Sequence, residues 1–363
     1  QKEMERSKKP VLKKTESFGW FDGEKLASQI SVYPMQVNLF GTMYNMGGVT
    51  GVATYPEYMG HGLMAHLMKK ALDNMRENHQ CVSMLFPYLI PYYRKKGWEI
   101  VSDKMTYTIK DTQLPKHRKV GGMVERVDID SEDVHRVHDA FSAMRHGALK
   151  RNELEWEEYW RWEADDVLVA VYYDANEKPT GYLVYYIAND VFRIKELVYV
   201  NQEARHGLWN YISAHFSMIE KVVGNNYTNE PMAFLLEDSE IQEEIEPYIM
   251  ARIVDFEEFI RQYPFDIISI HDDLQFIIDD PIMECNCGDF SLRWDAKGNT
   301  ILERGGTRGE TVRCNIQTLT AMFYGYKRPT YLKRVERLAA NDTAVRILED
   351  IIPIEQPYFS DYF

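Results

Sequence analysis

The stretch that decides the fold is residues 47–64, GGVTGVATYPEYMGHGLM. Its first part is rich in β-branched and aromatic residues, which favour a strand, and Pro56 cannot donate to a sheet and should end that strand. Gly60 and Gly62 follow, and beyond them apolar residues recur at the spacing of one helical face. That face comprises Leu63, Met64, Leu67, Met68, Ala71, Leu72 and Met75. The stretch therefore predicts a strand, a turn and a helix.

The predicted turn has the composition of a phosphate-binding loop. A glycine-containing loop that opens a helix collects unpaired backbone N–H groups at the positive end of the helix dipole. That arrangement binds phosphate groups. On these residues alone, a surface strand, turn and helix that bind no ligand fit equally well.

Length, apolar runs and charge limit the classes of protein to which the chain can belong. Its 363 residues predict two or three domains. No apolar run approaches the ~18 residues of a membrane span, and the N-terminus lacks the apolar segment of a signal peptide. The net charge of −14 argues against nucleic-acid binding and is compatible with a cationic substrate. We expect a cytoplasmic protein without nucleic-acid or membrane partners.

The cysteines point to a reduced protein. Cys81, Cys285, Cys287 and Cys314 fit neither a disulfide framework nor a zinc site built from two cysteine pairs. Cys285 and Cys287 could be a fragment of a metal site, but we interpret them as alternate residues on one face of a strand. We therefore expect reduced thiols, as in the cytoplasm, and no metal.

Periodicity predicts three successive units. The first has strands at 27–39, 43–55, 81–86 and 98–110, and helices at 60–77 and 92–96. After a polar linker at 111–123, the second has strands at 124–127, 167–173, 180–188 and 192–200, and helices from Asp130 or Ser131 to Met144 and at 205–222. The third, from residue 267, has strands at 275–278, 288–294, 300–303 and 311–315, and helices at 317–325 and 333–338.

A short repeat connects the first two units. His61-Gly62-Leu63 recurs as His206-Gly207-Leu208, and at the same offset the strand before it meets a strand of the second unit. Three identities could be coincidence, but the matching order of strand, loop and helix favours a duplication. The second unit has only one of the glycines and has Asn201 in place of the proline. We interpret it as a duplicate that has lost the phosphate loop.

The central stretch resembles the acyl-CoA site of the GNAT superfamily of N-acetyltransferases. Residues 52–56, VATYP, match the end of that family's cofactor-binding strand, and residues 59–64, MGHGLM, match its Gln/Arg-x-x-Gly-x-Gly/Ala loop in part. Met59 stands where the family has Arg or Gln, and Met64 where it has Gly or Ala. His61, Lys69 or Lys70 could supply the missing positive charge. The resemblance implies acetyl-CoA as cosubstrate, bound by Val52, Ala53, Thr54, Met59, Gly60, His61, Gly62, Leu63, Met64 and Tyr88.

The third unit resembles a sterol-carrier-protein-like domain, through residues 276–281, 288–292 and 319–326. Two GNAT-like units and this domain together resemble the enhanced intracellular survival family of acetyltransferases. The resemblance implies an α+β fold with domains at 1–115, 116–266 and 267–363, the first without its N-terminal part and the second degenerate. Family members acetylate aminoglycosides and lysine side chains and commonly assemble as hexamers, so it also implies an amine acceptor and a homo-oligomer.

Two catalytic positions follow from the same resemblance. Residues 92–98, YYRKKGW, match the family's Tyr-x-x-x-Gly-aromatic turn and place Tyr93 on the proposed general acid, with Tyr92 as its neighbour. The aromatic chain end matches the family's C-terminus, whose carboxylate reaches the active site, so the α-carboxylate of Phe363 is the expected base or orienting group. The alternatives are a tyrosine and an aromatic anchor with structural roles only. The alternative function is a catalytically decayed protein that binds acyl-CoA or lipid.

Overall fold

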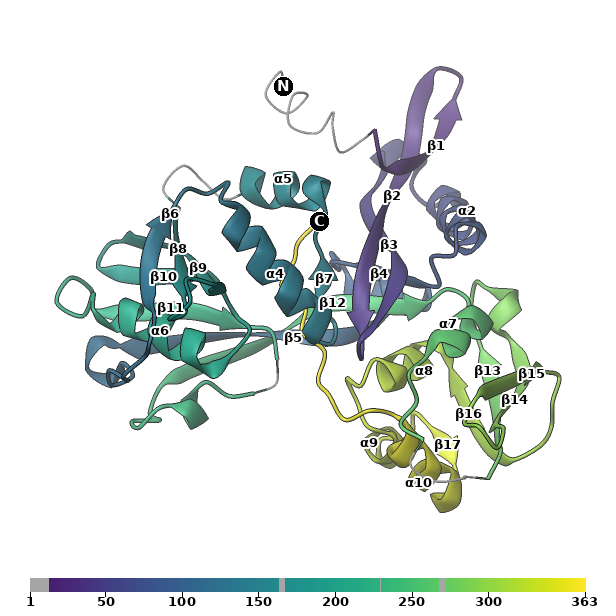
Figure 1. Cartoon of the computed structure of the whole chain (residues 1–363). Coiled ribbons are helices and arrows are strands. Elements are labelled where there is room, and N and C mark those ends of the chain that lie inside the picture. The colour runs from purple at the N-terminus through teal and green to yellow at the C-terminus, as the bar shows by residue number, and fades with distance from the viewer. Residues whose placement is uncertain (1–12, 163–166, 229, 268–271) are drawn as a thin grey trace. The chain divides into compact units, whose positions relative to one another are not determined.

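The computed structural model describes residues 13–162, 167–228, 230–267 and 272–363. The chain divides into two compact units, whose elements Figure 1 labels. The first unit comprises residues 1–102, 248–357 and 363, and the second comprises residues 103–247 and 358–362. The first domain was expected to lack its N-terminal part. That expectation concerns residues 1–12 and what precedes them, which lie outside the described residues.

The first unit opens with an antiparallel meander of long strands. These are β1 (Glu16–Asp22), β2 (Lys25–Leu39) and β3 (Thr42–Thr54). The helix α2 (Leu63–Glu77) then crosses over the sheet, so that β4 (Val82–Leu85) returns parallel to β3. The last residues of β12 (Gln242–Ile253) pair antiparallel with β4. Apolar residues of α2, including Leu67 and Ala71, form one buried cluster with Ile30, Val32 and Val49 of the sheet.

The same unit also contains a smaller, five-stranded sheet. Its order is β15 (Thr300–Arg304), β14 (Gly288–Trp294), β13 (Leu274–Asp279), β16 (Glu310–Asn315) and β17 (Ala339–Ala340), with only β13 and β16 parallel. Its helices are α7 (Phe256–Gln262), α8 (Ile316–Phe323), α9 (Pro329–Arg334) and α10 (Asp342–Ile351). Buried aromatic rings, among them Phe256, Phe276 and Phe290, pack edge to face in its interior.

The second unit is a twisted sheet with a helix on each face. Its strand order is β5 (Glu99–Lys110), β11 (Lys221–Asn226), β10 (Val191–Tyr199), β9 (Pro179–Ala188), β8 (Leu168–Tyr173) and β6 (Met123–Val127). Strand residues alternate between two cores. Ala170 and Tyr172 pack with α6 (Gln202–Ser213), whereas Val169 and Val171 pack with α4 (Glu132–Met144). The short β7 (Leu149–Lys150) and α5 (Glu153–Trp162) complete the unit.

Most predicted elements are present, and the α+β fold class is confirmed. Three predictions are wrong. The helix expected at 205–222 ends at Ser213, because the last part of that range forms the start of strand β11 at Lys221. The helix expected at 333–338 is α9, which ends at Arg334. Cys285 and Cys287 do not alternate on a strand, because they lie in and after the 3₁₀ helix η4 (Glu284–Asn286), before β14 begins.

Two further findings concern metals and membranes. Within the described residues, no group of histidine, cysteine and acidic side chains is arranged to hold a metal ion. In the same part of the chain, no helix combines the length and the apolar character needed to cross a membrane.

Candidate functional site

The strand β3 separates from β4 where the sequence predicts the cofactor. The two strands pair only from Met46 with Val82 to Val49 with Leu85, after which β4 ends and β3 continues to Thr54. Beyond that point Gly51 has a φ of +59°, and the register of β3 with β2 shifts, which marks a β-bulge. Among the described strands only β2 pairs with β3 beyond Val49. The opposite edge at Val52, Ala53 and Thr54 is thus available to an extended ligand.

The loop after β3 leads into an open helix start. It contains the 3₁₀ helix η1 (Pro56–Tyr58), followed by Met59, which is 62% exposed. Gly60 and Gly62 have φ values of +84° and +77°, and Gly62 is the N-cap of α2 without any side-chain cap. A Cβ added at Gly60 would meet nothing within 4 Å, and one at Gly62 would meet only His66 at 4.0 Å. The loop thus borders open space at both glycines.

The side chains proposed to replace the missing arginine differ in their partners. His61 and Lys70 are exposed, and the structure records no ion pair for either within its described part. Lys69 pairs with Asp73 one turn along α2. A ring nitrogen of His66 lies 3.0 Å from the carbonyl oxygen of Gly62. Of the residues proposed to replace the missing arginine, Lys70 and His61 therefore remain available.

Tyr93 lies in a fixed, buried position. It belongs to α3 (Ile90–Arg94), and its carbonyl accepts hydrogen bonds from the amides of Lys96 (2.9 Å) and Trp98 (3.1 Å). The turn needs Gly97, which has a φ of +93°. The Tyr93 ring packs edge to face on Tyr92 and Trp98, in one cluster with Val49. Burial, and less strongly Tyr92, raises the pKa of Tyr93. The described structure records no hydrogen-bond partner for its hydroxyl.

Phe363 also lies against β3. A Cβ built on Gly48 would stand 2.9 Å from Cε2 of Phe363 and 3.0 Å from Sδ of Met35, so the ring packs directly on this glycine. Adjacent strand residues point to opposite faces. Val49 belongs to the same buried cluster as Tyr93, whereas the neighbouring Gly48 contacts Phe363 on the opposite face of β3. Phe363 therefore lies beside the last residues of β3 that pair with β4.

The segment after β4 carries exposed aromatic and aliphatic residues. Tyr88, expected to bind the cofactor, is 97% exposed, and Leu89 is 55% exposed. Tyr88 follows the end of β4 by three residues, so the strand end brings it near the same opening. No contact of Tyr88 with the Gly60 loop is recorded among the described residues.

The residues just before Phe363 are anchored in the second unit, as expected of an aromatic tail. The amide of Tyr358 donates to the carbonyl of His146 (2.9 Å), and its ring packs edge to face on Phe141 and Tyr227. Asp361 accepts a hydrogen bond from buried Arg151 (2.6 Å). Tyr362, in contrast, is 57% exposed. The sequence showed the aromatics but not the ion pair.

The helix α6 of the second unit does not begin as α2 does. It is capped by Asn201, whose side chain accepts a hydrogen bond from the amide of Ala204 (2.8 Å). Gly207 lies inside α6, where an added Cβ would stand 2.2 Å from the ring of Tyr172. The two copies of the tripeptide therefore do not occupy equivalent positions, because Gly62 is the N-cap of α2 and Gly207 lies in the middle of α6.

Comparisons with known families identify three parts of the chain. Residues 1–101 and 147–253 each match an acetyltransferase (GNAT) domain, and residues 256–360 match a sterol carrier protein domain. The chain consists of two GNAT domains and a sterol carrier protein domain. The resemblance found in the sequence is thus confirmed, including the second GNAT domain. These domains make acyl transfer the supported activity. No curated protein sequence matches the chain.

Solved structures share this tandem GNAT architecture. A probable N-acyltransferase of unknown function from Enterococcus faecalis has a TM-score of 0.92 at 29% identity, covering 100% of this chain and 93% of that chain. A GCN5-related N-acetyltransferase from Anabaena variabilis has a TM-score of 0.87 at 23% identity, covering 99% and 92%. Eis1 from Mycobacterium abscessus has a TM-score of 0.82 at 17% identity, covering 96% and 90%. The latter two show the shared fold.

Proposed function

We propose that this protein transfers an acetyl group from acetyl-CoA to a primary amine. The observation that carries the proposal is the opening of β3 from β4 beside an uncapped helix start, both within the first GNAT domain. Backbone groups of Val52, Ala53 and Thr54 would bond the pantetheine amides as an added strand does. The amides from Gly60 to Leu63 would hold the pyrophosphate, and the open space at both glycines admits its oxygens.

The acyl transfer would be direct. The neutral amine attacks the thioester carbonyl, and collapse of the tetrahedral intermediate breaks the carbon–sulfur bond and releases the thiolate of CoA. The Tyr93 hydroxyl donates a proton to this thiolate, and the proton that the attacking nitrogen loses passes to water, from which Tyr93 is protonated again. The raised pKa of Tyr93 keeps its proton on the phenol at neutral pH, so the donor is available. A direct attack fits the absence of cysteine from residues 47–64.

The amine would be received on the other face of β3, beside Phe363. An α-carboxylate has a pKa of about 3.5, which makes it a weak base toward an alkylammonium. Where Phe363 ends the chain, its carboxylate would therefore orient the ammonium or take the proton through water. Its ring, packed on Gly48, supports this position. An aminoglycoside-like polyamine or a lysine side chain fits the net charge of −14.

A decayed protein that binds acyl-CoA or lipid is the second candidate, and Met59 favours it. The family's Arg or Gln at this position would pair with the pyrophosphate, and an exposed methionine cannot. The sterol carrier protein domain would then carry a lipid. Its described interior is occupied by the packed rings of Phe256, Phe276 and Phe290, which argues for a structural core.

Two measurements in sequence test the proposal. Acetyl-CoA should raise the melting temperature, because a ligand of the native state stabilises it. Release of free thiol should then depend on both acetyl-CoA and an amine from a panel of aminoglycosides, polyamines and lysine peptides. No thermal shift at millimolar acetyl-CoA refutes cofactor binding, and a shift without amine-dependent thiol release supports the decayed protein. We further propose that the protein is cytoplasmic and that it forms a homo-oligomer, commonly a hexamer in the family. Sedimentation velocity tests the oligomeric state.

A further inference from the structure

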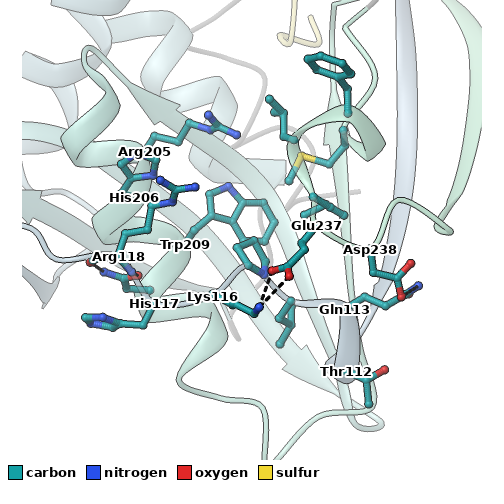
Figure 2. A pocket seen from close by; sticks show the side chains of 17 residues that line it. Thr112, Gln113, Lys116, His117, Arg118, Arg205, His206, Trp209, Glu237 and Asp238 are labelled. Carbon is teal, nitrogen blue, oxygen red and sulfur yellow. Dashed lines mark hydrogen bonds and ion pairs between the residues drawn. The ribbon is translucent and has the colours of Figure 1, made fainter.

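The second unit contains a pocket of about 840 Å³ that the proposed acetyl transfer does not use (Figure 2). Three segments far apart in the sequence line it. They are residues 112–118 after β5, the first turns of α6, and residues 232–238 around the 3₁₀ helix η3 (Ala233–Leu235). Its volume lies in the range of about 300–1,000 Å³ that small-molecule sites occupy.

One wall of the pocket is cationic. Figure 2 shows Arg118, Arg205 and His206 together on the same side. The structure records no ion pair for the guanidinium of either arginine in the described part of the chain, and Arg205 bonds only the amide oxygen of Gln202 (3.2 Å). Burial, then Arg118 and Arg205, lowers the pKa of His206. Unneutralised like charges repel each other, so an anion placed among them would stabilise the group.

This wall is held rigidly. The amide of Arg118 donates to the side chain of Asn210 (2.9 Å), and the same side chain donates back to the carbonyl of Arg118 (2.7 Å). Because Asn210 lies on α6 with Arg205 and His206, these two hydrogen bonds hold the 112–118 segment against the helix that carries those two side chains. Residues 112–118 form the connection after β5, but these hydrogen bonds give Arg118 a defined position beside α6.

The remaining surfaces of the pocket include apolar side chains. Trp209, 5% exposed, lies between the cationic wall and Glu237 in Figure 2. Phe234 is 88% exposed and Leu235 is 51% exposed, so large apolar surface faces solvent. Such surface is costly to leave in water and commonly marks a site of binding. A ligand of this pocket should therefore combine an anion with an apolar or aromatic body.

One ion pair crosses the pocket and limits its charge. Lys116 bonds Glu237 at 2.6 Å, and both side chains are largely exposed, at 80% and 74% (dashed lines in Figure 2). An exposed pair contributes about 0–1 kcal/mol, so a ligand could displace it at small cost. Loss of Glu237 would add the charge of Lys116 to the cationic side.

We propose that this pocket binds a small organic phosphate with an aromatic or apolar body. The phosphate would lie on Arg118, Arg205 and His206, since arginine forks match phosphate oxygens, and the body would lie against Trp209 and Phe234. The amide of Ala204 in the first turn of α6 is already bonded to the side chain of Asn201, so the proposed donors are side chains. The site differs in this from the Gly60 loop, where backbone amides are the donors.

Calorimetry with four probes tests the ligand class: adenosine monophosphate, phenyl phosphate, adenosine and inorganic phosphate. We use the Gly62→Glu background as well as the wild type, so that binding at the Gly60 loop is separable. Both organic phosphates should bind in both backgrounds, and adenosine at least about tenfold more weakly, because a lost charged hydrogen bond contributes about 1.5–3 kcal/mol. A preference for adenosine monophosphate identifies a nucleotide, and equal binding identifies the phosphate and a general apolar body.

Variants locate the site. Arg118→Gln and Arg205→Gln should each weaken phenyl phosphate about tenfold or more. The matched control is Arg136→Gln, an exposed arginine on α4 of the same unit that pairs with Glu132 and Asp133, and it should leave binding unchanged. Glu237→Gln should tighten binding by freeing Lys116. Nuclear magnetic resonance of His206 should show its pKa rising when phosphate binds.

Three outcomes would overturn the proposal. The first is no binding of either organic phosphate at millimolar concentration. The second is binding that disappears in the Gly62→Glu background, which would place the ligand at the Gly60 loop. The third is equal loss in Arg136→Gln and the pocket variants at unchanged melting temperature, which would indicate diffuse attraction of anions. All three outcomes are measured as phosphate binding, so they can be interpreted even if the protein transfers no acetyl group.

Discussion

Two adjacent glycines decide what can lie on each face of β3. A Cβ at Gly47 would stand 2.7 Å from the sulfur of Met75 on α2, whereas one at Gly48 would collide with Phe363 on the other face. The first glycine thus lets the helix approach the strand, and the second lets the chain end approach it. Neither position was among the residues expected from the sequence, because a glycine pair in a strand does not reveal its neighbours.

Gly62→Glu should abolish acetyl-CoA binding while the fold survives. The added carboxylate would carry negative charge to the helix start where we propose the pyrophosphate, and the φ of +77° disfavours a side chain. Calorimetry with acetyl-CoA and a thermal melt check this. Gly60→Ala serves as the control for backbone strain alone, because its φ is also positive and nothing lies near its added Cβ. Micromolar binding by Gly62→Glu would place the cofactor elsewhere.

Tyr93→Phe should lower turnover by about 10²- to 10⁴-fold, the usual contribution of a general acid, and should leave the affinity for acetyl-CoA nearly unchanged. The ring contacts with Tyr92 and Trp98 are kept and only the hydroxyl is lost. Steady-state kinetics and calorimetry give the two quantities. Tyr92→Phe is the matched control and should retain turnover. The reverse result would assign the acid to Tyr92.

Met59→Arg should tighten acetyl-CoA binding, and the gain should shrink as salt rises. Arginine would restore the cation that GNAT proteins usually carry here, and an exposed ion pair is screened by salt. Affinity measured at low and high sodium chloride checks both parts. Weaker binding by the variant would show that the methionine itself contacts the cofactor.

At the scale of elements, the two GNAT domains differ in how the helices α2 and α6 are capped at their N-termini. Gly62 is the N-cap of α2 and makes no side-chain hydrogen bond, whereas Asn201 is the N-cap of α6 and its side chain accepts a hydrogen bond from the amide of Ala204. A self-capped helix offers fewer amides to phosphate. The N-cap of α6 thus differs from that of α2, and the pocket beside α6 is lined by arginine side chains.

The sheet and α4 of the second unit enclose a histidine that should make stability depend on pH. Burial, then Arg151, lowers the pKa of His138 to about 3, whereas an unfolded histidine has about 6.5. As pH decreases below 6.5, His138 becomes protonated in the unfolded state but stays neutral in the folded state. The free energy of unfolding should therefore decrease. The expected loss by pH 5.5 is about 1 kcal/mol. Urea unfolding at both pH values measures it, and His138→Asn should flatten the dependence. An equal slope in the variant would contradict this origin.

At the scale of the whole molecule, the last residues belong to different units. Tyr358 to Tyr362 belong to the second unit, in which Asp361 bonds Arg151, and Phe363 belongs to the first, where it packs on Gly48. Arg151 also bonds Glu196, so its guanidinium is paired on both sides although its side chain is fully buried. A buried charge needs such partners.

Deleting Phe363, or appending a short Gly-Ser tail to it, should reduce turnover strongly while melting temperature and acetyl-CoA binding stay near the wild type. The deletion removes ring and carboxylate together, and the appended tail moves only the carboxylate. Comparing the two by thiol release separates the roles. If the extended protein keeps full turnover, Phe363 is an anchor and its carboxylate takes no part in the chemistry.

The sequence by itself determined the strand, loop and helix of residues 47–64 and the hairpin to which this strand belongs. These features depend on local rules, namely apolar periodicity, glycine at positive φ and proline at a strand end. Such rules act within a few residues, so a linear reading recovers them. The same reading marked Tyr93 and the aromatic chain end, through motifs that are contiguous in the chain.

Only the tertiary structure decided which distant residues meet. It brought β12 beside β4, Phe363 to Gly48, and residues 112–118 to α6 and residues 232–238 around one pocket. It also showed that Gly207 packs on Tyr172 and does not cap a helix. Contacts of this kind are set by packing between segments far apart in sequence, where side-chain shape and burial decide the partner, and no local pattern records them.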